Sequence, residues 1–328
     1  MENEQMTAEK LLDIKDLAIE YHTDEAVIYA VNHVSLSINK GETVGLVGET
    51  GAGKTSIARC ILGILPIPPA KVISGEISYY GKDLLKYSER EMRKIRGNKI
   101  AMIFQDPMTA LNPIETVGFQ IAETIKQHNK ISPAEAYQRT CDMLELVGIS
   151  AERFKDFPHQ FSGGMKQRVV IAMALACNPE LLLADEPTTA LDVTIQAQVL
   201  EMMLSLKEKF QTSVVMITHD LGLVAGFCDK VAVVYAGEIV ESGTVEDIYD
   251  RANHPYTLGL FASLPKLNAT EKRLKPIKGL MPDPTNLPDG CRFYERCPDA
   301  KDECSKSSPQ EVEIAPGHTV KCFFAGGK

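Results

Sequence analysis

The sequence of 328 residues has no tryptophan, no excess of positive charge and no long apolar run. Its longest unbroken apolar stretch, Val169–Cys177, has nine residues, whereas a membrane-spanning helix needs roughly 18. The first ten residues are polar and of mixed charge, unlike a secretory signal peptide. With 35 basic and 44 acidic residues, the chain lacks the basic footprint of a nucleic-acid-binding protein. We therefore expect a folded protein that stays in the cytoplasm and does not bind nucleic acid.

Several segments within the first 235 residues have the apolar pattern of buried strands. Residues 11–48 alternate between apolar and polar and end in the short apolar run Val44–Val47. Further apolar strands are expected at 99–104, 181–184, 213–218 and 231–235, with helices between them, the first over 54–65. Strands that alternate with helices predict an α/β fold with a largely parallel sheet.

Two segments depart from this pattern. Residues 106–161 are rich in helix formers, and Ser132-Pro133 reads as a helix start with serine as the cap and proline in the first turn. This segment is a candidate helical insert. After about Asp250, prolines become frequent and the tail is expected to be rich in loops.

A glycine-rich loop stands between a predicted strand and a predicted helix. Its sequence, Gly48-Glu-Thr-Gly51-Ala-Gly53-Lys54-Thr55, fits the P-loop pattern. The glycines allow backbone N–H groups to surround phosphate oxygens, and the helix start adds positive potential. Lys54 would supply a positive charge to the β- and γ-phosphates, and the Thr55 hydroxyl would bind Mg²⁺. The motif does not separate ATP from GTP.

The strand expected at 181–184 ends in two acids, Asp185 and Glu186. Alone, such a pair would be read as a solvated strand end. Beside a P-loop, however, phosphoryl transfer needs a metal holder and a group that positions water. We assign Asp185 to the Mg²⁺ shell and Glu186 to the general base.

Between these motifs lies Phe161-Ser162-Gly163-Gly164-Met165-Lys166-Gln167-Arg168. Together with them it resembles the signature of the ATP-binding cassette family. The other landmarks of that family follow in order: Gln105 after a strand, Ala190-Leu191-Asp192, and His219 after the strand 213–218. Phe161 and Met165 depart from the common signature, which has leucine and glutamine there.

The resemblance implies a P-loop NTPase cassette over about 1–250, with a mixed sheet, an N-terminal antiparallel β subdomain and a helical subdomain near 106–165. It implies ATP as the substrate, and Gln105 and His219 near the γ-phosphate with Glu186. Asp192 is assigned to the catalytic group, and Gln105 joins Thr55 and Asp185 around Mg²⁺. Ser162, Gly163 and Gly164 would address ATP bound on a second protomer. The residues assigned to nucleotide binding are Tyr21, Gly48, Thr50, Gly51, Ala52, Gly53, Lys54, Thr55 and Ser56, with Tyr29 competing with Tyr21 for the adenine.

Two further stretches resemble the peptide-importer branch of that family. One is Gln105–Pro113, and the other is His254-Pro-Tyr-Thr257 with the Pro- and Gly-containing tail that continues to Cys291. The branch implies a C-terminal extension at 251–328 and uptake of dipeptides or oligopeptides. It implies as partners a second, non-identical ATPase, two membrane permeases and, indirectly, an extracytoplasmic peptide-binding protein. The chain would then act at the cytoplasmic face of the membrane. A nickel or other small-solute importer and a non-transport ATPase are the alternatives.

Four of the eight cysteines, Cys291, Cys297, Cys304 and Cys322, lie in the last 38 residues. Their spacing lacks the short Cys-x2–4-Cys knuckles of zinc sites and the ferredoxin run. Spacing alone therefore leaves a soft metal or free thiols. The resemblance implies a [4Fe–4S] cluster, with zinc as the alternative. We expect His318 at the surface, not as a ligand. The other four cysteines are interpreted as small buried hydrophobic residues.

Overall fold

The computed structural model describes residues 9–189, 191–264 and 276–326. The chain forms two compact units, each assembled from separate stretches. Of the described residues, unit 1 combines 9–11 with 38–43 and those within 86–217, and unit 2 combines 12–37, 44–85 and those from 218 onward. The expected P-loop therefore belongs to unit 2, and the expected acidic pair, helical insert and signature belong to unit 1.

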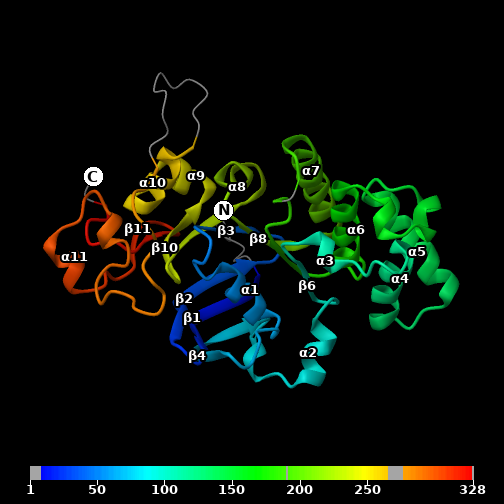
Figure 1. The fold of residues 1–328 in the computed structure, drawn as a ribbon, viewed down its shortest axis with the longest axis horizontal. Helices are drawn as coiled ribbons and strands as arrows, with labels where there is room; N and C mark the ends of the chain where they lie inside the picture. The colour runs from blue at the N-terminus through cyan, green and yellow to red at the C-terminus, as the bar shows by residue number, and fades with distance from the viewer. Residues whose placement is uncertain (1–8, 190, 265–275, 327–328) are drawn as a thin grey trace, which may run out of the picture. The chain divides into compact units, whose positions relative to one another are not determined.

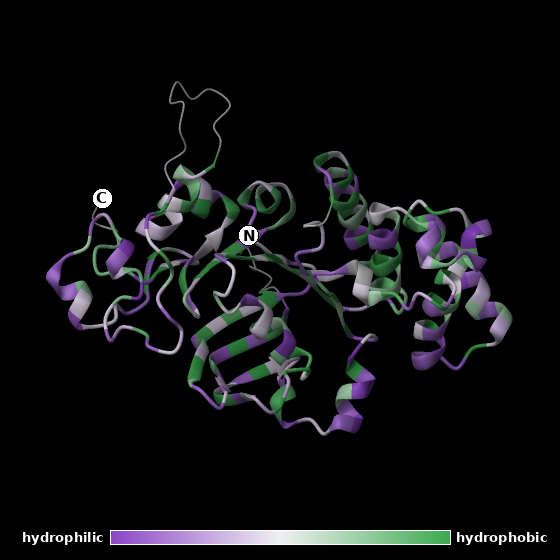
Figure 2. Cartoon of the chain, in the orientation of Figure 1, coloured by the Kyte–Doolittle hydropathy of each residue, from purple (hydrophilic) through white to green (hydrophobic). Residues whose placement is uncertain are grey.

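Unit 2 contains an antiparallel sheet with strand order β2-β1-β4-β5. In β1, Leu12, Ile14 and Ile19 are almost fully buried, and Leu12 and Ile14 lie opposite Tyr79 and Ile77 of β4. Burial alternates along the first part of β4, whereas Leu11–Ile14 of β1 are all buried. The strands of this sheet are banded in Figure 2. The strands are β1 (Lys10–His22), β2 (Val27–Asn39), β4 (Ala70–Tyr79) and β5 (Lys82–Asp83).

A second set of strands in unit 2 runs in the order β11-β12-β10-β9-β3. β3 pairs in parallel with β9, whereas β10 pairs antiparallel with both β9 and β12. All five residues of β3 are buried, so its end is a fixed point from which the glycine-rich loop starts. The strands are β3 (Thr43–Val47), β9 (Lys230–Tyr235), β10 (Glu238–Thr244), β11 (Val312–Ala315) and β12 (His318–Val320).

Helices of unit 2 follow or precede these strands. α1 begins at the lysine of the glycine-rich loop, and α10 begins at Pro255 with His254 as its cap. The helices are α1 (Lys54–Ile61), α8 (Leu221–Phe227), α9 (Val245–Asp250), α10 (Pro255–Ala262) and α11 (Asp302–Lys306), with a short 3-10 turn at Tyr294–Arg296.

Unit 1 contains the parallel strands β6 (Ile100–Ile103), β7 (Leu181–Asp185) and β8 (Ser213–Thr218), with β7 in the middle. Its helical insert is as expected: α5 begins at Pro133, and the Ser132 hydroxyl accepts the Glu135 N–H. α4 and α5 lie side by side in Figure 1. The helices are α2 (Glu89–Ile95), α3 (Pro107–Ala110), α4 (Val117–His128), α5 (Pro133–Leu146), α6 (Gly163–Leu175) and α7 (Val193–Phe210); 3-10 turns lie at Leu84–Lys86, Ala151–Lys155 and Pro158–Gln160.

The predicted α/β class, mixed sheet and N-terminal antiparallel subdomain are confirmed. The expectation for the tail needs correction at one residue. His318 is 1% exposed, not at the surface, and its Nε2 lies 3.0 Å from the Glu241 carboxylate, also buried. This contact ties β12 to β10, so part of the tail is an added sheet edge and not a loop.

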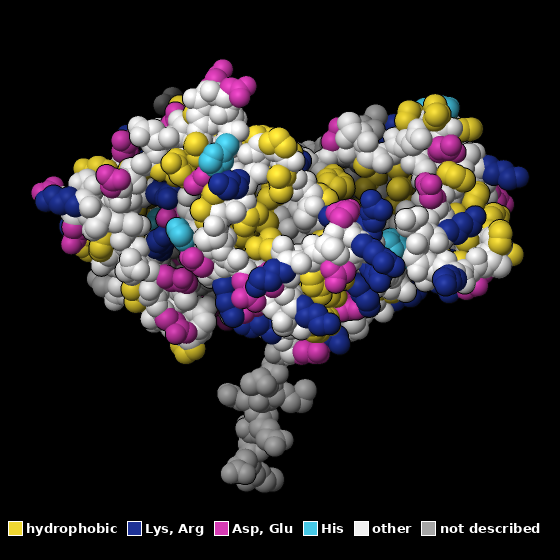
Figure 3. Space-filling view, turned by 90° about the horizontal axis from the view of Figure 1, so that it is seen from below, with side chains coloured by type: hydrophobic (Ala, Val, Ile, Leu, Met, Phe, Trp, Pro, Cys, Tyr) yellow, Lys and Arg dark blue, Asp and Glu magenta, His cyan; other side chains and the backbone are white. Residues whose placement is uncertain are grey.

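On the face shown in Figure 3, Lys and Arg side chains are interspersed with Asp and Glu side chains. No helix within the described ranges combines the length and the apolar character that crossing a membrane requires.

His254 gives the fold a dependence on pH. Its side chain is 1% exposed, and its Nδ1 accepts the Tyr256 N–H at 3.1 Å. Burial lowers the pKa of His254 to about 3, so the folded protein keeps this imidazole neutral at pH values where the unfolded chain protonates it.

We expect acid to destabilise the protein through His254. A depressed histidine pKa favours the unfolded state as pH falls below about 6.5, and this residue alone should cost about 1.4 kcal/mol between pH 7.5 and 5.5. Urea unfolding at both pH values measures this loss. His254→Asn keeps a capping side chain but cannot titrate, so its free energy of unfolding should fall less. An equal fall in both proteins would contradict the assignment.

Candidate active site

The glycine-rich loop of unit 2 is held close to two backbone carbonyls. A Cβ on Gly48 would lie 2.0 Å from the Val234 oxygen, and one on Gly53 would lie 2.2 Å from the Ala30 oxygen. Gly53 also has a φ of 98°, a left-handed conformation that favours glycine. It caps α1 without a side-chain hydrogen bond, and the N-terminus of a helix favours an anion.

Lys54 is 6% exposed and lies along this loop. Its Nζ donates to the carbonyl oxygens of Gly48 at 2.7 Å and Glu49 at 2.8 Å. Ala52 is buried, Thr50 and Gly51 are exposed, and Thr55 and Ser56 are half-buried in the first turn of α1. The predicted phosphate-binding residues therefore form one continuous turn of backbone with a buried ammonium group beneath it.

Of the two tyrosines expected to compete for the adenine, Tyr21 is the one joined to α1. Its hydroxyl lies 2.9 Å from the Ser56 hydroxyl, and the residue is half-buried at the end of β1. Tyr29 is 38% exposed on β2, and its backbone N–H donates to the Pro284 carbonyl at 2.9 Å. Tyr21 is therefore fixed beside the expected nucleotide residues, and Tyr29 stands at the edge of the tail.

In unit 1, the predicted base and the predicted glutamine meet. Gln105 donates from Nε2 to the Glu186 carboxylate at 2.9 Å, and the Thr189 hydroxyl donates to the same oxygen at 3.0 Å. Asp185 is the last residue of β7 and is 3% exposed. Glu186 has a φ of 47°, and its N–H donates to the Ile217 carbonyl. This backbone turns the Glu186 side chain out of the strand direction.

The signature residues of unit 1 start α6. The Ser162 hydroxyl caps the helix by accepting the Met165 N–H at 3.4 Å. Gly163 has open space where a Cβ would stand, whereas a Cβ on Gly164 would meet Ile195 of α7 at 2.6 Å. The helix start is thus exposed at Ser162 and Gly163 and packed at Gly164.

The remaining predicted residues lie at element ends. Asp192 caps α7, and its Oδ1 accepts the Ile195 N–H at 3.0 Å. Ala190, from the same predicted loop, lies outside the described residues. His219 directly follows β8 and is exposed.

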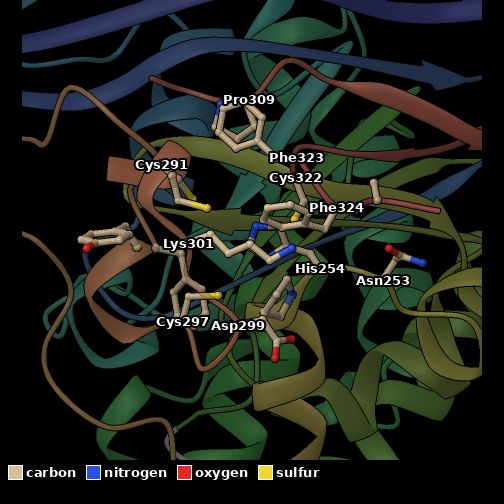
Figure 4. A pocket seen from close by; sticks show the side chains of 15 residues that line it. Asn253, His254, Cys291, Cys297, Asp299, Lys301, Pro309, Cys322, Phe323 and Phe324 are labelled. Carbon is tan, nitrogen blue, oxygen red and sulfur yellow. The ribbon is translucent and has the colours of Figure 1, made fainter. Parts of the chain in front are cut away.

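The four C-terminal cysteines all line one cavity of about 500 Å³ in unit 2. Figure 4 shows Cys291, Cys297 and Cys322 around it, with His254 and Lys301. Burial raises the pKa of the Cys291 thiol to about 11 and also raises that of Cys297. Among the residues that the structure describes, no three His, Cys, Asp or Glu side chains are close enough together to hold one metal ion.

Sequence reasoning missed two residues that contact the glycine-rich loop at Glu49. Arg296 pairs with Glu49 at 2.9 Å, and the Tyr256 hydroxyl accepts the Glu49 N–H at 3.1 Å. Glu49 occupies an unspecified position of the P-loop pattern, and its partner is 247 residues away. No sequence signal links them.

Two family models match this chain. The model described as "ABC transporter" covers residues 31–189, and the model described as "Oligopeptide/dipeptide transporter, C-terminal region" covers residues 240–304. The matches include the glycine-rich loop, the acidic pair and three of the four C-terminal cysteines.

Relatives match over nearly the whole chain. The oligopeptide transport ATP-binding protein OppD of Bacillus subtilis is 51% identical, with 96% of this chain and 89% of that protein covered. The dipeptide transport ATP-binding protein DppD of the same species is 49% identical, covering 96% and 95%. OppD of Escherichia coli is 45% identical, covering 97% and 94%.

Solved structures share the fold. A dimeric ATP-binding cassette in a post-hydrolysis state with ADP and phosphate matches with a TM-score of 0.65 and 29% identity, covering 72% of this chain and 99% of that one. CbiO1 of Clostridium perfringens, part of an ABC transporter complex, matches with a TM-score of 0.64 and 25% identity, covering 74% and 92%.

The geometry predicts that Tyr21 carries the adenine contact. Tyr21→Ala should weaken ATP affinity by roughly 1–3 kcal/mol, as when a base loses an aromatic stacking partner. Tyr21→Phe removes only the hydroxyl that contacts Ser56, so it should bind nearly as the unchanged protein does. Equilibrium titration with a fluorescent ATP analogue measures both. A loss seen only with Tyr29→Ala would move the adenine to that ring.

Proposed function

The chain belongs to the ATP-binding subunits of oligopeptide and dipeptide transporters, and from this premise we propose that it hydrolyses ATP to drive the uptake of short peptides across a membrane. The observation that carries the proposal is the near full-length match to peptide-transport proteins, which includes the tail as well as the cassette. Because these relatives are named for peptides, we favour peptides over nickel or another small solute as cargo, and transport over a non-transport role.

In the proposed reaction, the backbone N–H groups of 48–53 and the start of α1 bind the phosphates. Lys54 exchanges its two carbonyl partners for phosphate oxygens. A hydrogen bond from the ammonium group to a charged phosphate oxygen is stronger than one to a neutral carbonyl. The oxygen-bearing side chains of Thr55 and Asp185 suit Mg²⁺, a hard cation that prefers oxygen ligands. Bound Mg²⁺ supplies charge neutralisation at the β- and γ-phosphates.

Glu186 is the proposed base that accepts the proton of the attacking water. Gln105 and Thr189 already donate to its carboxylate, and these two hydrogen bonds fix its orientation. We propose that Gln105 transfers this contact to Mg²⁺ or the water once nucleotide is bound, and that His219 hydrogen-bonds the γ-phosphate. Asp192 caps α7 and would fix the start of this helix near Glu186.

The proposed working form pairs this subunit with a second ATPase, a non-identical relative, beneath two membrane permeases that receive peptide from an extracytoplasmic binding protein. The exposed start of α6 at Ser162 and Gly163 supports a role in trans, because an uncovered helix N-terminus attracts anions. One solved structure that shares the fold is itself a dimer bound to ADP and phosphate. The subunit would act at the cytoplasmic face of the membrane.

We expect Glu186→Gln to slow ATP hydrolysis by about 100-fold or more, because a general base contributes at least that much, while ATP binding is retained. Glu180→Gln is the matched control: Glu180 immediately precedes the same strand at its other end, where it pairs with Lys99. Unchanged turnover in Glu186→Gln would remove its role as the base.

The transport proposal is tested in vesicles that contain this chain, its partner ATPase and the two permeases. ATP-dependent accumulation of labelled dipeptides or oligopeptides should occur with the unchanged chain and stop with Glu186→Gln. Hydrolysis that responds to nickel and to no peptide would replace the proposed cargo.

We also propose that the cysteine cavity holds a [4Fe–4S] cluster. Four thiols supply the complete ligand set of such a cluster. They line one cavity without converging on a single point, which suits a group of several metal ions better than the single zinc ion that is the alternative. Bound iron would fix the extension by joining four segments of 291–322, a structural role that suits a tail with a small core.

Protein purified without oxygen should be brown and contain iron and sulfide. Cys291→Ser, Cys297→Ser and Cys304→Ser should each lose most of the colour, because each removes a ligand. Cys177→Ser should keep it, since Cys177 lies in unit 1, where it contacts the Thr124 carbonyl. Absorption spectra and metal analysis decide the matter: a colourless protein with full zinc occupancy would defeat the cluster.

A further inference from the structure

The tail reaches the phosphate-binding loop through one buried cation. The Arg296 side chain is 6% exposed, and its Nη1 lies 2.9 and 3.1 Å from the two carboxylate oxygens of Glu49. The same Nη1 donates to the Tyr235 hydroxyl at 3.2 Å, and Nε donates to the Lys278 carbonyl at 3.1 Å. All of these residues belong to unit 2.

Glu49 is held on three sides. Arg296 binds its carboxylate, the Tyr256 hydroxyl accepts its N–H, and its own carbonyl accepts the Lys54 ammonium. Tyr256 is itself fully buried, and burial raises the pKa of its phenol, so it stays neutral. A continuous series of contacts therefore runs from the tail through Glu49 to the lysine expected to bind phosphate.

The charge of Glu49 makes these contacts consequential. A carboxylate in a loop that binds a triphosphate repels its ligand, and the repulsion is strong where the surroundings are partly buried. Arg296 neutralises that carboxylate with a hydrogen-bonded pair, and such charge-assisted bonds are the strong ones. Without Arg296, Glu49 would present a free negative charge within the phosphate-binding turn.

Arg296 lies in a turn that is held by backbone hydrogen bonds and by a buried aromatic ring. The Cys291 N–H donates to the Cys304 carbonyl at 2.7 Å, and the N–H groups of Tyr294 and Arg296 donate to the Cys291 and Phe293 carbonyls. Phe293 is 2% exposed and packs against the rings of Tyr235 and Tyr256. The guanidinium is thus presented to the loop by a fixed segment that also carries two of the cavity cysteines.

We propose that Arg296 is a positioning residue for nucleotide binding: it neutralises and anchors Glu49, so that the C-terminal tail completes the phosphate-binding loop. The inference rests on the nucleotide site proposed above. Arg296 acts on the affinity for ATP and not on the chemical step, because it contacts the loop through Glu49 and touches no reacting atom.

The test is a double-mutant cycle on the full-length chain, with ATP affinity measured by equilibrium titration. Arg296→Gln should raise the Kd for ATP by roughly 10-fold, the effect of losing a charged hydrogen-bond partner. Glu49→Gln removes the repelling charge and should bind ATP at least as tightly as the unchanged protein. The double variant should lie within about 3-fold of the unchanged protein, since the unpaired carboxylate is then absent.

Arg292→Gln is the matched control. Arg292 lies in the same turn and is also largely buried, but it pairs with Glu238 and donates to the Ala236 carbonyl, both outside 48–53. The Kd of Arg292→Gln for ATP should stay within about 2-fold of that of the unchanged protein, as for a substitution away from the loop. In the assembled transporter, Arg296→Gln should raise KM for ATP and leave kcat unchanged.

Equal Kd values for Arg296→Gln and the unchanged protein would overturn the proposal, as would a double variant as weak as Arg296→Gln. Should Arg296→Gln not fold, Arg296→Lys replaces it in both backgrounds. One ammonium cannot make both the Glu49 contact of Nη1 and the Lys278 contact of Nε, so a smaller loss is expected, about 3-fold, which Glu49→Gln should abolish. A loss that is the same in both backgrounds would mean a structural role only.

Lys54→Ala separates this inference from the site on which it rests. It should abolish measurable ATP binding, whatever Arg296 does. If Lys54→Ala bound ATP normally, the nucleotide site itself would be wrong and the inference would fall with it. If Lys54→Ala loses binding while the cycle shows no coupling, the site stands and only the role of Arg296 is refuted.

Discussion

Gly48 and Gly53 mark the two places where the phosphate-binding loop passes against backbone that cannot move aside. The Val234 carbonyl faces Gly48 and the Ala30 carbonyl faces Gly53, each too close for a side chain. The Gly237 N–H also donates to the Ala52 carbonyl at 3.0 Å. Neighbouring strands therefore fix the shape of the loop before any ligand binds. Ligand binding then does not have to order the loop, which would cost conformational entropy.

A fixed loop still has to bind anions, and the local charges are arranged around that requirement. Lys54 lies beneath the turn with its ammonium on two carbonyls, a set of partners that is weaker than phosphate. Glu49 is the one acid within the turn, and Arg296 faces it. With Glu49 and Arg296 paired, the negative charge in the turn is offset, and Lys54 and the positive end of α1 are the groups that favour an anion there.

The local elements could be read from the sequence because local chemistry fixes them. The Ser132 hydroxyl caps the helix that Pro133 begins, as the pair predicts, and the apolar positions of 11–38 lie in the strands β1 and β2. Gln105 and Glu186 were assigned to one reaction from motif order, and the structure brings their side chains to 2.9 Å. Their roles in the reaction stay predictions, but the strands that present them end at the same edge, as parallel neighbours must.

What could not be read depends on contacts with no local signature. His318 was expected at the surface because an isolated histidine in a proline-rich tail has no apolar pattern around it. It is buried since β12 adds to β10, which places it against Glu241. Arg296 and Glu49 illustrate the same limit at greater distance: each is an ordinary charged residue in its own segment, and only the packing of Phe293 against Tyr235 and Tyr256 brings them together. The tail thus contacts the glycine-rich loop by way of its aromatic core, and the cysteine cavity shares Phe293 and the turn 291–297 with that contact.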